Sequence, residues 1–512
     1  MAEVSSREGT MPTAPPSGPT SVPLCVDLDG TLVKSDTLMD AAMALWRKEP
    51  LSPLKWPAWI AQGKAGLKHE ITRRVDLDVE HLPYNQPLLA YLREEYFAGR
   101  KIYLATAANG ALAQRVAEHL GIFAGVLASD GKLNLAGKNK LAAFEAQFPD
   151  GFTYIGNALP DRHLLRKSVD PMVANPHMRL LRVMRSDGVK PVRTFEDRAS
   201  GLKAFVKAVR LHQWAKNTLV FVPMLLAHSA SPNRLAAVVM AFFSLGFCAS
   251  ATYIINDLLD IEADRKHPRK RRRAFAAGDL SPVAGVGIVV VFFAISISLA
   301  LLLPKVYASL PGEAGIYEVL GHPLRFALWL SVYTVSTLAY SVRLKRMMLV
   351  DVMVLSGLYT LRMLAGSAAA GVQISTWLAA FSIFFFLSLA FVKRFSELFM
   401  LAGNSESDDD IKPSGRGYRL SDMEQVRSFG TSAGYASVVV LTMYISSLDS
   451  PLLYQHPRKL WLLAPILLLW LSRVWLLASR GEMHEDPVVY ALTDKRSWLL
   501  GALCAFVVWW AL

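Results

Sequence analysis

The chain has few cysteines and few charged residues for its length. Its 512 residues contain three cysteines, Cys25, Cys248 and Cys504, so far apart in sequence that we expect reduced packing residues rather than a disulfide scaffold. Charged residues make up 19%, below the roughly one quarter typical of soluble proteins, whereas apolar residues make up 53%. This composition excludes a disordered or collagen-like chain. It predicts a membrane-embedded region together with at least one further domain.

Acidic residues are the minority among the charges. Lys and Arg number 55 against 42 Asp and Glu, which gives a net charge of +13. Such an excess suits anionic lipid headgroups or phosphorylated substrates, and it does not by itself indicate nucleic acid. We therefore expect the bilayer as a partner and no nucleic-acid partner.

The first part of the chain differs from the rest in texture. Residues 1–22 are rich in Ser, Thr, Pro and Gly, which predicts a disordered leader rather than a signal peptide. Residues 23–200 alternate short apolar strands with amphipathic helical stretches, the pattern of an α/β domain. Without a signal peptide, this domain is expected in the cytoplasm.

Residues 201–512 repeat apolar runs that are long enough to cross a bilayer. The basic residues concentrate in alternate loops, on the side of the N-terminal domain. The sequence therefore predicts an all-α, multi-pass domain in the inner (cytoplasmic) membrane. We expect about nine spans, near residues 214–229, 235–256, 281–303, 324–341, 349–371, 376–396, 428–447, 459–477 and 497–512.

Two aspartates follow the first expected strand, PLCVDLDGTL. Asp27 and Asp29 lie one residue apart at its carboxyl end, the edge at which open α/β sheets bind ligands. One carboxylate suits a nucleophile that attacks phosphorus, and the other suits the acid/base that moves the proton of the leaving oxygen.

Later in the chain, four more residues complete this pattern. Thr106 ends a second strand, where its hydroxyl would hold phosphate, and Lys140 would neutralise phosphoryl charge. Asn157 and Asp161 offer oxygen ligands for Mg²⁺.

The order of these motifs resembles the haloacid dehalogenase superfamily of mostly magnesium-dependent phosphatases, over about residues 23–180. The resemblance implies a Rossmann-like fold with a helical cap in residues 33–100. It makes Asp27 the nucleophile and Asp29 the acid/base, with the metal held by Asp27, Asn157 and Asp161. The family usually has an acidic residue at the position of Asn157. A degenerate domain that only binds phosphate or docks is the alternative.

A second acidic motif follows the second expected span. Asp257, Asp260 and Asp264 are spaced by three and four residues, which would stack them on one helical face beside Asn256. Carboxylates gathered at a membrane boundary need a cation, and oxygen ligands favour Mg²⁺.

A basic run, RKHPRKRRR, follows this motif directly. Its arginines and lysines, among them Arg265, Lys270 and Arg273, would bind the remaining charge of a metal-bridged polyphosphate. For most of the run, an ordinary inside-facing topogenic signal explains the charge better.

Further polar residues occur near the ends of the later spans. A carboxylate and an arginine inside an apolar helix, Asp351 and Arg362, are costly unless they pair or bind a ligand. The cations at span boundaries are equally explained by snorkelling to the interface. The expected substrate-binding residues in these segments are Lys216, Tyr340, Lys345, Asp351, Arg362, Lys393 and Arg394.

NDLLDIEAD, about nine spans and the YSxxLK…D segment resemble the UbiA superfamily of intramembrane transferases, over about residues 203–512. Aromatic prenyltransferases of that family carry two aspartates four apart in the second motif, where this chain has Asp351 and Leu355. The single aspartate, with LHQWAKN and VKRFSEL, is closer to the decaprenyl-phosphate phosphoribosyltransferase branch. That resemblance implies a Mg²⁺-bound phosphoribosyl pyrophosphate as donor and a polyprenyl phosphate as acceptor.

The expected function is therefore a phosphoribosyl transfer, followed by removal of the sugar phosphate by the fused phosphatase domain. The alternatives are a polyprenyl diphosphate:aromatic prenyltransferase, a transporter and a binding-only scaffold. The sequence shows no internal repeat of the kind that many transporters have, which argues against the transporter. Residues 405–419 are expected to be a solvated linker rather than a lid. The sequence leaves lipid length, pathway and a homo-oligomeric state open.

Overall fold

The computed structural model describes residues 22–61, 63–129, 135, 137–228, 231–308, 324–402, 417–448, 450–483 and 486–512. The expected leader at 1–22 and the expected linker at 405–419 lie almost entirely outside these residues. The chain divides into two compact units. The first contains the described residues up to Ala204 together with Leu259–Pro282, and the second contains Phe205–Leu258 and Val283–Leu512. The domain limit expected after residue 200 stays a prediction.

The first unit is built on a parallel six-stranded sheet with the order β3-β2-β1-β4-β5-β6. The expected α/β architecture with a parallel sheet is therefore confirmed. The strand order reverses direction at β1, which pairs with β2 on one side and β4 on the other. The strands are β1 (Leu24–Val26), β2 (Ile102–Asn109), β3 (Gly125–Ser129), β4 (Thr153–Gly156), β5 (Pro171–Ala174) and β6 (Arg193–Phe195).

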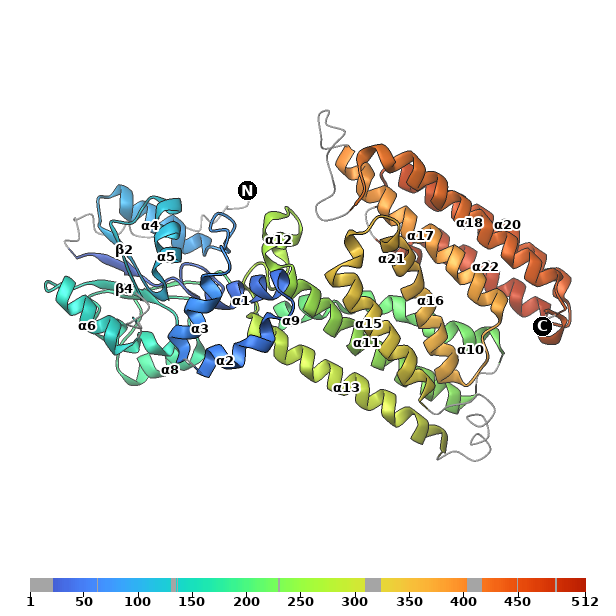
Figure 1. Cartoon of the computed structure of the whole chain (residues 1–512), viewed down its shortest axis with the longest axis horizontal. Coiled ribbons are helices and arrows are strands. Elements are labelled where there is room, and N and C mark those ends of the chain that lie inside the picture. The colour runs from blue at the N-terminus through green and yellow to red at the C-terminus, as the bar shows by residue number, and fades with distance from the viewer. Residues whose placement is uncertain are drawn as a thin grey trace, which may run out of the picture. The chain divides into compact units, whose positions relative to one another are not determined.

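Helices cover both faces of this sheet (Figure 1). The alternation of side chains in β1 shows why: Leu24 and Val26 join the core under α4 and α5, whereas Cys25 joins the core under α6, α7 and α8. All three cysteines are free, as expected. The covering helices are α4 (Gln86–Phe97), α5 (Gly110–Leu120), α6 (Lys138–Gln147), α7 (Arg162–Lys167) and α8 (Met178–Ser186).

Two helical segments complete the first unit. One lies within the expected cap and consists of α1 (Thr37–Lys48), η1 (Ser52–Lys55), α2 (Trp56–Ala61) and α3 (Gly63–Thr72). The other follows the second acidic motif and contains α12 (Ile261–Lys266) and the 3-10 turn η4 (Lys270–Arg272). A short stretch between two membrane helices in sequence is therefore part of the N-terminal unit.

The second unit is helical. Six helical segments among the described residues are long and apolar enough to cross a membrane. They contain α11 (Pro232–Leu259), α13 (Pro282–Ala308), α16 (Val350–Ala370), α17 (Thr376–Ala402), α18 (Met423–Ser446) and α20 (Leu463–Ser479).

Three of the nine expected spans are not among these six. The stretch expected at 214–229 is not one helix but a 3-10 segment, η3 (Leu211–Phe221), followed by the short α10 (Val222–Leu226). Pro223 starts the new helix there. The other two are α15 (Arg325–Val342), of 18 residues, and α22 (Lys495–Ala511), of 17 residues. The second unit also contains the short helices α19 (Ser450–Leu453) and α21 (Pro487–Thr493) and the 3-10 turns η5 (Leu344–Arg346), η6 (Leu420–Asp422) and η7 (Pro457–Leu462). The helix α9 (Gly201–Val209) begins in the first unit and ends in the second.

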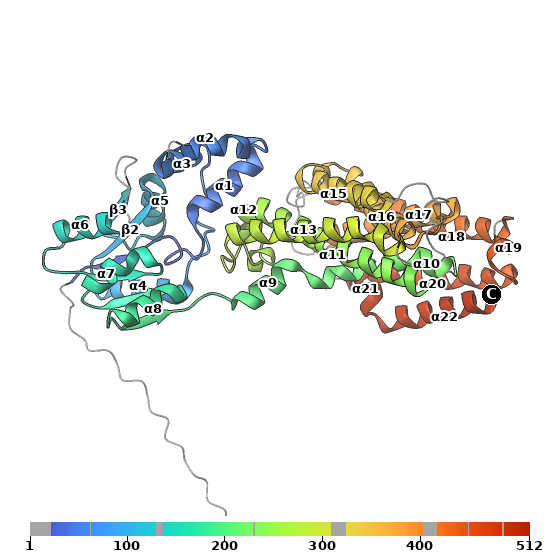
Figure 2. The same cartoon turned by 90° about the horizontal axis from the view of Figure 1, so that it is seen from below.

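Small residues let the membrane helices approach closely. Ser244 of α11 and Ser296 of α13 each donate to the other's backbone carbonyl, at 2.9 and 2.8 Å, where the two helices run together (Figure 2). A Cβ added at Gly366 of α16 would lie 2.1 Å from the carbonyl oxygen of Val220, so η3 contacts this helix backbone to backbone. Such small-residue contacts are typical of membrane helix packing.

Candidate active sites

The first site lies at the carboxyl end of β1. The backbone N–H of Asp27 donates to the carbonyl of Ile155 on β4, which fixes the aspartate beside the end of that strand. Gly30 then turns the chain with φ +76°, and a Cβ there would lie 2.0 Å from Nδ2 of Asn157. Only glycine allows both this backbone conformation and this close approach.

Lys140 of α6, a helix on the Cys25 face of the sheet, contacts Asp27. Lys140 Nζ lies 2.7 Å from Asp27 Oδ1 and 2.8 Å from the hydroxyl of Tyr154. That hydroxyl donates to Asp161, whose other oxygen accepts from the backbone N–H groups of Asn157 and Ala158. The network fixes the loop after β4 against the end of β1.

The expected phosphatase residues all line one cavity of about 500 Å³. Strands β1, β2 and β4 end side by side in a parallel sheet, which explains why residues so distant in sequence meet here. The sequence-based set in this wall is Asp27, Asp29, Thr106, Lys140, Asn157 and Asp161. Their placement therefore matches the expectation, whereas their catalytic roles stay predictions.

Two carboxyl groups of this cavity have strongly raised pKa values. Burial raises the pKa of Asp27 to about 6, and Lys140 opposes the shift. Burial, followed by the nearby charge of Asp36, raises the pKa of Asp29 to about 7. Desolvated carboxylates that repel one another are the donor set that a hard divalent cation such as Mg²⁺ binds. The residues present therefore fit the expected metal.

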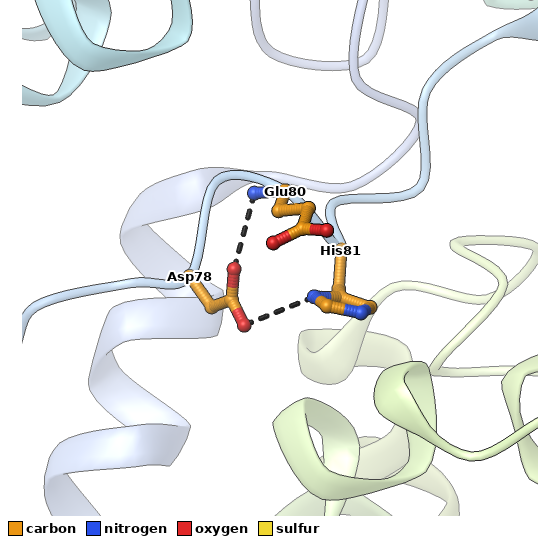
Figure 3. A group of neighbouring side chains, drawn as sticks. All are labelled: Asp78, Glu80 and His81. Atoms are coloured by element: carbon orange, nitrogen blue, oxygen red, sulfur yellow. Dashed lines mark hydrogen bonds and ion pairs between the residues drawn. The ribbon is translucent and has the colours of Figure 1, made fainter. Parts of the chain in front are cut away.

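A separate acidic group lies at Asp78, Glu80 and His81 (Figure 3). In the part of the chain that the structure describes, these three offer the one cluster of His, Cys, Asp and Glu ligand atoms close enough for a single ion. Asp78 accepts from His81 and from the backbone of Glu80, and it pairs with Lys266 at 2.8 Å. These internal contacts already account for the cluster, so it supports no metal site.

The spacing of the second acidic motif predicted one continuous helical face, and this prediction is wrong. Helix α11 ends at Leu259, and Asp260 adopts φ −100° and ψ 8° before α12 begins. Asn256 and Asp257 belong to the second unit, whereas Asp260 and Asp264 belong to the first. The break at Asp260 turns the chain out of the long helix.

Each aspartate of this motif is paired with an arginine. Arg210 Nη2 contacts both oxygens of the buried Asp257, at 2.5 and 2.7 Å. Asp264 pairs with Arg273 at 2.7 Å, and Asp260 pairs with Arg47 of α1 at 3.5 Å. The carboxylates are thus already arranged to bind positive charge.

The basic run contributes to the first unit in different ways. Arg265 is buried and contacts Asp40 at 2.8 Å, the hydroxyl of Ser35 and the carbonyl of Ala276, so its guanidinium fixes this segment to α1. Arg273 holds Asp264, and Lys270 lies partly exposed in η4. Substrate binding by Arg265, Lys270 and Arg273 stays a prediction.

The second unit contains a buried polar cluster centred on a residue that sequence reasoning missed. Asp486 accepts from Lys216 at 2.6 Å, from Lys393 at 3.2 Å and from the hydroxyl of Tyr359 at 3.0 Å. Burial alone would raise the pKa of Asp486, but Lys393 and Lys216 hold it well below its usual range. The one signal in the sequence is an aspartate before Pro487, which is typical of a helix N-cap.

Arg362 extends this cluster along α16. Its Nε donates to Asn217 Oδ1 at 3.0 Å, and its Nη2 donates to the hydroxyl of Tyr333 at 2.9 Å. The guanidinium also lies over the rings of Tyr333 and Tyr359, 4.9 and 5.5 Å from their centroids. The arginine inside an apolar helix is therefore paired with polar and aromatic groups, as its cost in a membrane requires.

The remaining expected residues lie on α15, η5, α16 and α17. Arg394, 1% exposed, forms ion pairs with Asp351 and Glu397 and donates to the hydroxyl of Tyr340 at 3.1 Å. Asp351 also accepts from Tyr418 at 2.6 Å. Lys345 donates to Asn256 at 3.2 Å.

Burial decides between the two explanations offered for these cations. Lys216 and Arg394 are buried and paired inside the unit, which is not the geometry of snorkelling side chains. We call the set Lys216, Arg362, Lys393 and Arg394 the cation cluster. Its members come from η3, α16 and α17, and a charged phosphate group is the chemistry that such a group of donors binds.

Comparison with protein families now assigns the helical unit. The model of the UbiA prenyltransferase family matches residues 217–493, more than half of the chain. The chain belongs to the UbiA prenyltransferase family. The expected membership is confirmed, and with it a multi-pass membrane transferase.

The relatives of this UbiA-family protein differ in their sequence identity to it and in the length over which they match it. The uncharacterised protein y4nM of Sinorhizobium fredii is 37% identical over 489 residues, 94% of this chain and 90% of that protein. Decaprenyl-phosphate phosphoribosyltransferase of Corynebacterium glutamicum is 34% identical over 198 residues, 38% of this chain and 54% of that enzyme. A UbiA homologue from Archaeoglobus fulgidus, solved with GPP and Mg²⁺, is 14% identical with a TM-score of 0.42, covering 60% of this chain and 99% of that one.

Proposed function

We propose that the UbiA-like unit transfers the 5-phosphoribosyl group of phosphoribosyl pyrophosphate to a polyprenyl phosphate. The cation cluster carries this proposal: among the described residues its four cations, of which Lys393 is only partly buried, form ion pairs with three carboxylates, Asp351, Glu397 and Asp486. Such a site retains positive charge for an anionic ligand. The partial likeness to decaprenyl-phosphate phosphoribosyltransferase supports the choice of donor and acceptor.

In the proposed reaction one bond to the sugar is exchanged for another. The bond between C1 of ribose and the pyrophosphate oxygen breaks, and pyrophosphate leaves with the electron pair. A phosphate oxygen of the lipid forms the new bond to C1, so no net proton transfer is needed. Arg362 and the lysines of the cluster would draw charge onto the phosphates, and this electrostatic stabilisation and positioning account for catalysis.

The residues proposed to hold Mg²⁺ are Asn256, Asp257, Asp260 and Asp264. Their oxygen atoms suit the ion, which would take the place of the arginines as the positive charge beside the three aspartates. When bound, the ion would neutralise charge on the donor's diphosphate.

The test uses the full chain reconstituted in liposomes that contain decaprenyl phosphate. With labelled phosphoribosyl pyrophosphate and Mg²⁺, label should enter the lipid fraction together with an equal release of pyrophosphate. Arg362→Met should lower kcat/KM roughly 100-fold or more, and Asp260→Ala should abolish the Mg²⁺ response. Arg427→Met, an exposed site on α18, is the matched control. Full transfer by Arg362→Met and Asp260→Ala would refute the assignment.

The family's own description favours a second candidate, a prenyl transfer from an allylic diphosphate. Leu355, in place of a second aspartate, argues against it. The same liposomes supplied with geranyl diphosphate and an aromatic acid decide between the two. Product in that assay alone would establish the second candidate.

We further propose that the cavity at Asp27 hydrolyses the 5-phosphate of the lipid-linked ribose. Asp27 would attack phosphorus while Asp29 gives a proton to the departing sugar oxygen. Water would then release inorganic phosphate from Asp27, with Asp29 taking up a proton. Lys140, 2.7 Å from Asp27, would neutralise the phosphoryl oxygens. Attachment to the transferase raises the local concentration of this substrate.

Asp27→Asn in the full chain tests this second step. Lipid extracts should accumulate phosphorylated lipid-ribose, with phosphate release reduced at least about a thousandfold. Transfer of label to lipid should not change, which serves as an internal control. An unchanged ratio of phosphorylated to dephosphorylated lipid-ribose would refute the proposal.

A further inference from the structure

The wall of the cavity at Asp27 contains two further cations, besides the carboxylates of Asp36 and Asp279, that the hydrolysis of a simple phosphate does not require. Lys34 and Arg198 line it, together with residues 278–281 of the segment that follows the acidic motif. Lys140, which contacts Asp27 at 2.7 Å, would already neutralise the phosphoryl group there. The additional cations therefore call for a separate explanation.

Arg198 is a partly buried guanidinium with an unused donor. Its Nη2 donates to the backbone carbonyl of Lys34, but its Nε is buried and has no hydrogen-bond partner. Among the described residues, no ion pair of Arg198 with a carboxylate is found. Burial lowers its pKa, and Asp279 only partly opposes this. A desolvated guanidinium whose charge is only partly compensated and whose Nε lacks an acceptor is stabilised when an anion binds beside it.

The surrounding backbone keeps this arginine in place. Asp279 accepts from the N–H of Ala199, the residue after Arg198, at 3.2 Å. Gly278 has φ +72°, and a Cβ there would lie 2.9 Å from Cβ of Lys34, so no larger residue fits. Lys34 itself contacts Asp197 at 3.5 Å, a long ion pair that leaves its donors available for a shared anion.

We propose that Arg198 and Lys34 form a second anion subsite, which binds another phosphate of a doubly phosphorylated pentose while the first phosphate lies at Asp27. This inference rests on the proposed phosphatase function and narrows its substrate. The transferase product carries two phosphates, a monoester at C5 and the lipid phosphodiester at C1. The subsite would therefore favour lipid-linked ribose phosphate over a free sugar monophosphate. A cavity of about 500 Å³ is within the usual size of small-molecule sites.

Kinetics on the purified full chain test the subsite, with two soluble probes, ribose 5-phosphate and ribose 1,5-bisphosphate. The wild-type protein should release the 5-phosphate of the bisphosphate with the higher kcat/KM. Arg198→Met should remove about 10- to 100-fold of that preference, the value of one charge-assisted contact, and leave ribose 5-phosphate unchanged. Arg198→Lys should retain part of it, and Arg93→Met, exposed on α4, should behave as wild type. Equal losses for both probes would overturn the subsite and leave the phosphatase function intact.

Equilibrium binding separates a failure of the subsite from a failure of catalysis. Calorimetry with Asp27→Asn should show tighter binding of the bisphosphate than of the monophosphate, and adding Arg198→Met should remove the difference. Binding to the membrane unit is common to both proteins and cancels in the comparison. Absence of phosphate release from every probe would refute the phosphatase function, and equal binding of both probes would refute the subsite.

Discussion

The buried carboxyl groups of the two units have pKa values shifted in opposite directions. At the sheet edge, burial outweighs compensation, and Asp27 and Asp29 have pKa values raised to about 6 and 7. In the helical unit, Asp486 is surrounded by Lys216, Lys393 and Tyr359, and its pKa lies below the usual range. In the first site the nearby cations do not offset the burial of the carboxylates, whereas in the second they more than offset it.

This difference indicates what each site needs from outside the protein. A cavity with undercompensated carboxylates gains from a divalent cation, which then attracts a phosphate. A cluster in which cations outnumber carboxylates binds a phosphate group directly. The two proposed reactions, hydrolysis and transfer, follow from this contrast in charge balance rather than from the folds.

The largest expected effect comes from removing a cation of the helical unit. Arg394→Met would leave Asp351 buried without its ion pair and lower the free energy of unfolding by about 3–5 kcal/mol. Denaturation in mixed micelles at increasing SDS measures it. The double variant Arg394→Met/Asp351→Leu should recover most of the loss, because the fully buried carboxylate is gone and Glu397, which also loses its pair with Arg394, is partly exposed. A loss below about 1 kcal/mol in the single variant would show that this pair is not a buried one.

A smaller effect is expected from pH at the sheet edge. The folded-state pKa of Asp29 is raised, so folding favours its protonated form. That stabilisation is complete at low pH and is lost as pH rises towards about 7. Without Mg²⁺, the titration of Asp29 alone should lower the free energy of unfolding by about 2 kcal/mol between pH 5 and pH 7, at up to 1.4 kcal/mol per pH unit. Hydrogen exchange of peptides from β1 and β4 measures it.

Two controls sharpen this comparison. Asp29→Asn should reduce the pH dependence to the smaller contribution of Asp27, whose pKa is raised to about 6, because the amide does not titrate. Saturating Mg²⁺ should reduce the loss, because the ion binds the deprotonated carboxylates. Protection that rises with pH in EDTA would contradict the undercompensated state of this cavity.

The sequence predicted the sheet-edge site better than the helical cluster. Asp27 and Asn157 each follow a strand, and the parallel pairing of β1, β2 and β4 brings these strand ends together. Thr106 lines the same cavity but does not end its strand as expected, because β2 continues to Asn109 past a shift in its register with β3. Local pattern plus one topological rule was sufficient there. No comparable rule predicts the contacts of Asp486, because its partners Lys216 and Lys393 come from distant segments that meet only through helix packing.

Two further features of the chain also depended on tertiary structure. Spacing predicted that Asp257, Asp260 and Asp264 share one helical face, but the helix breaks at Asp260. Hydropathy predicted a span at 214–229, whereas Asn217 and Lys216 lie buried in a 3-10 segment beside Gly366 of α16. Periodicity describes a continuous helix, and it carries no signal for a break that other elements stabilise.

The smallest effect on stability is expected from an ion pair that is exposed to solvent. Arg427 and Glu424, one turn apart on α18, are both exposed, unlike Arg394 and Asp351. Water screens such a pair, and ordering two long side chains offsets the attraction. Arg427→Ala should therefore change the free energy of unfolding by less than about 1 kcal/mol in the SDS titration. Arg427→Lys is the control that keeps the charge. A loss comparable to that of Arg394→Met would mean that burial does not set the strength of ion pairs in this unit, and the contrast between its two kinds of pair would fail.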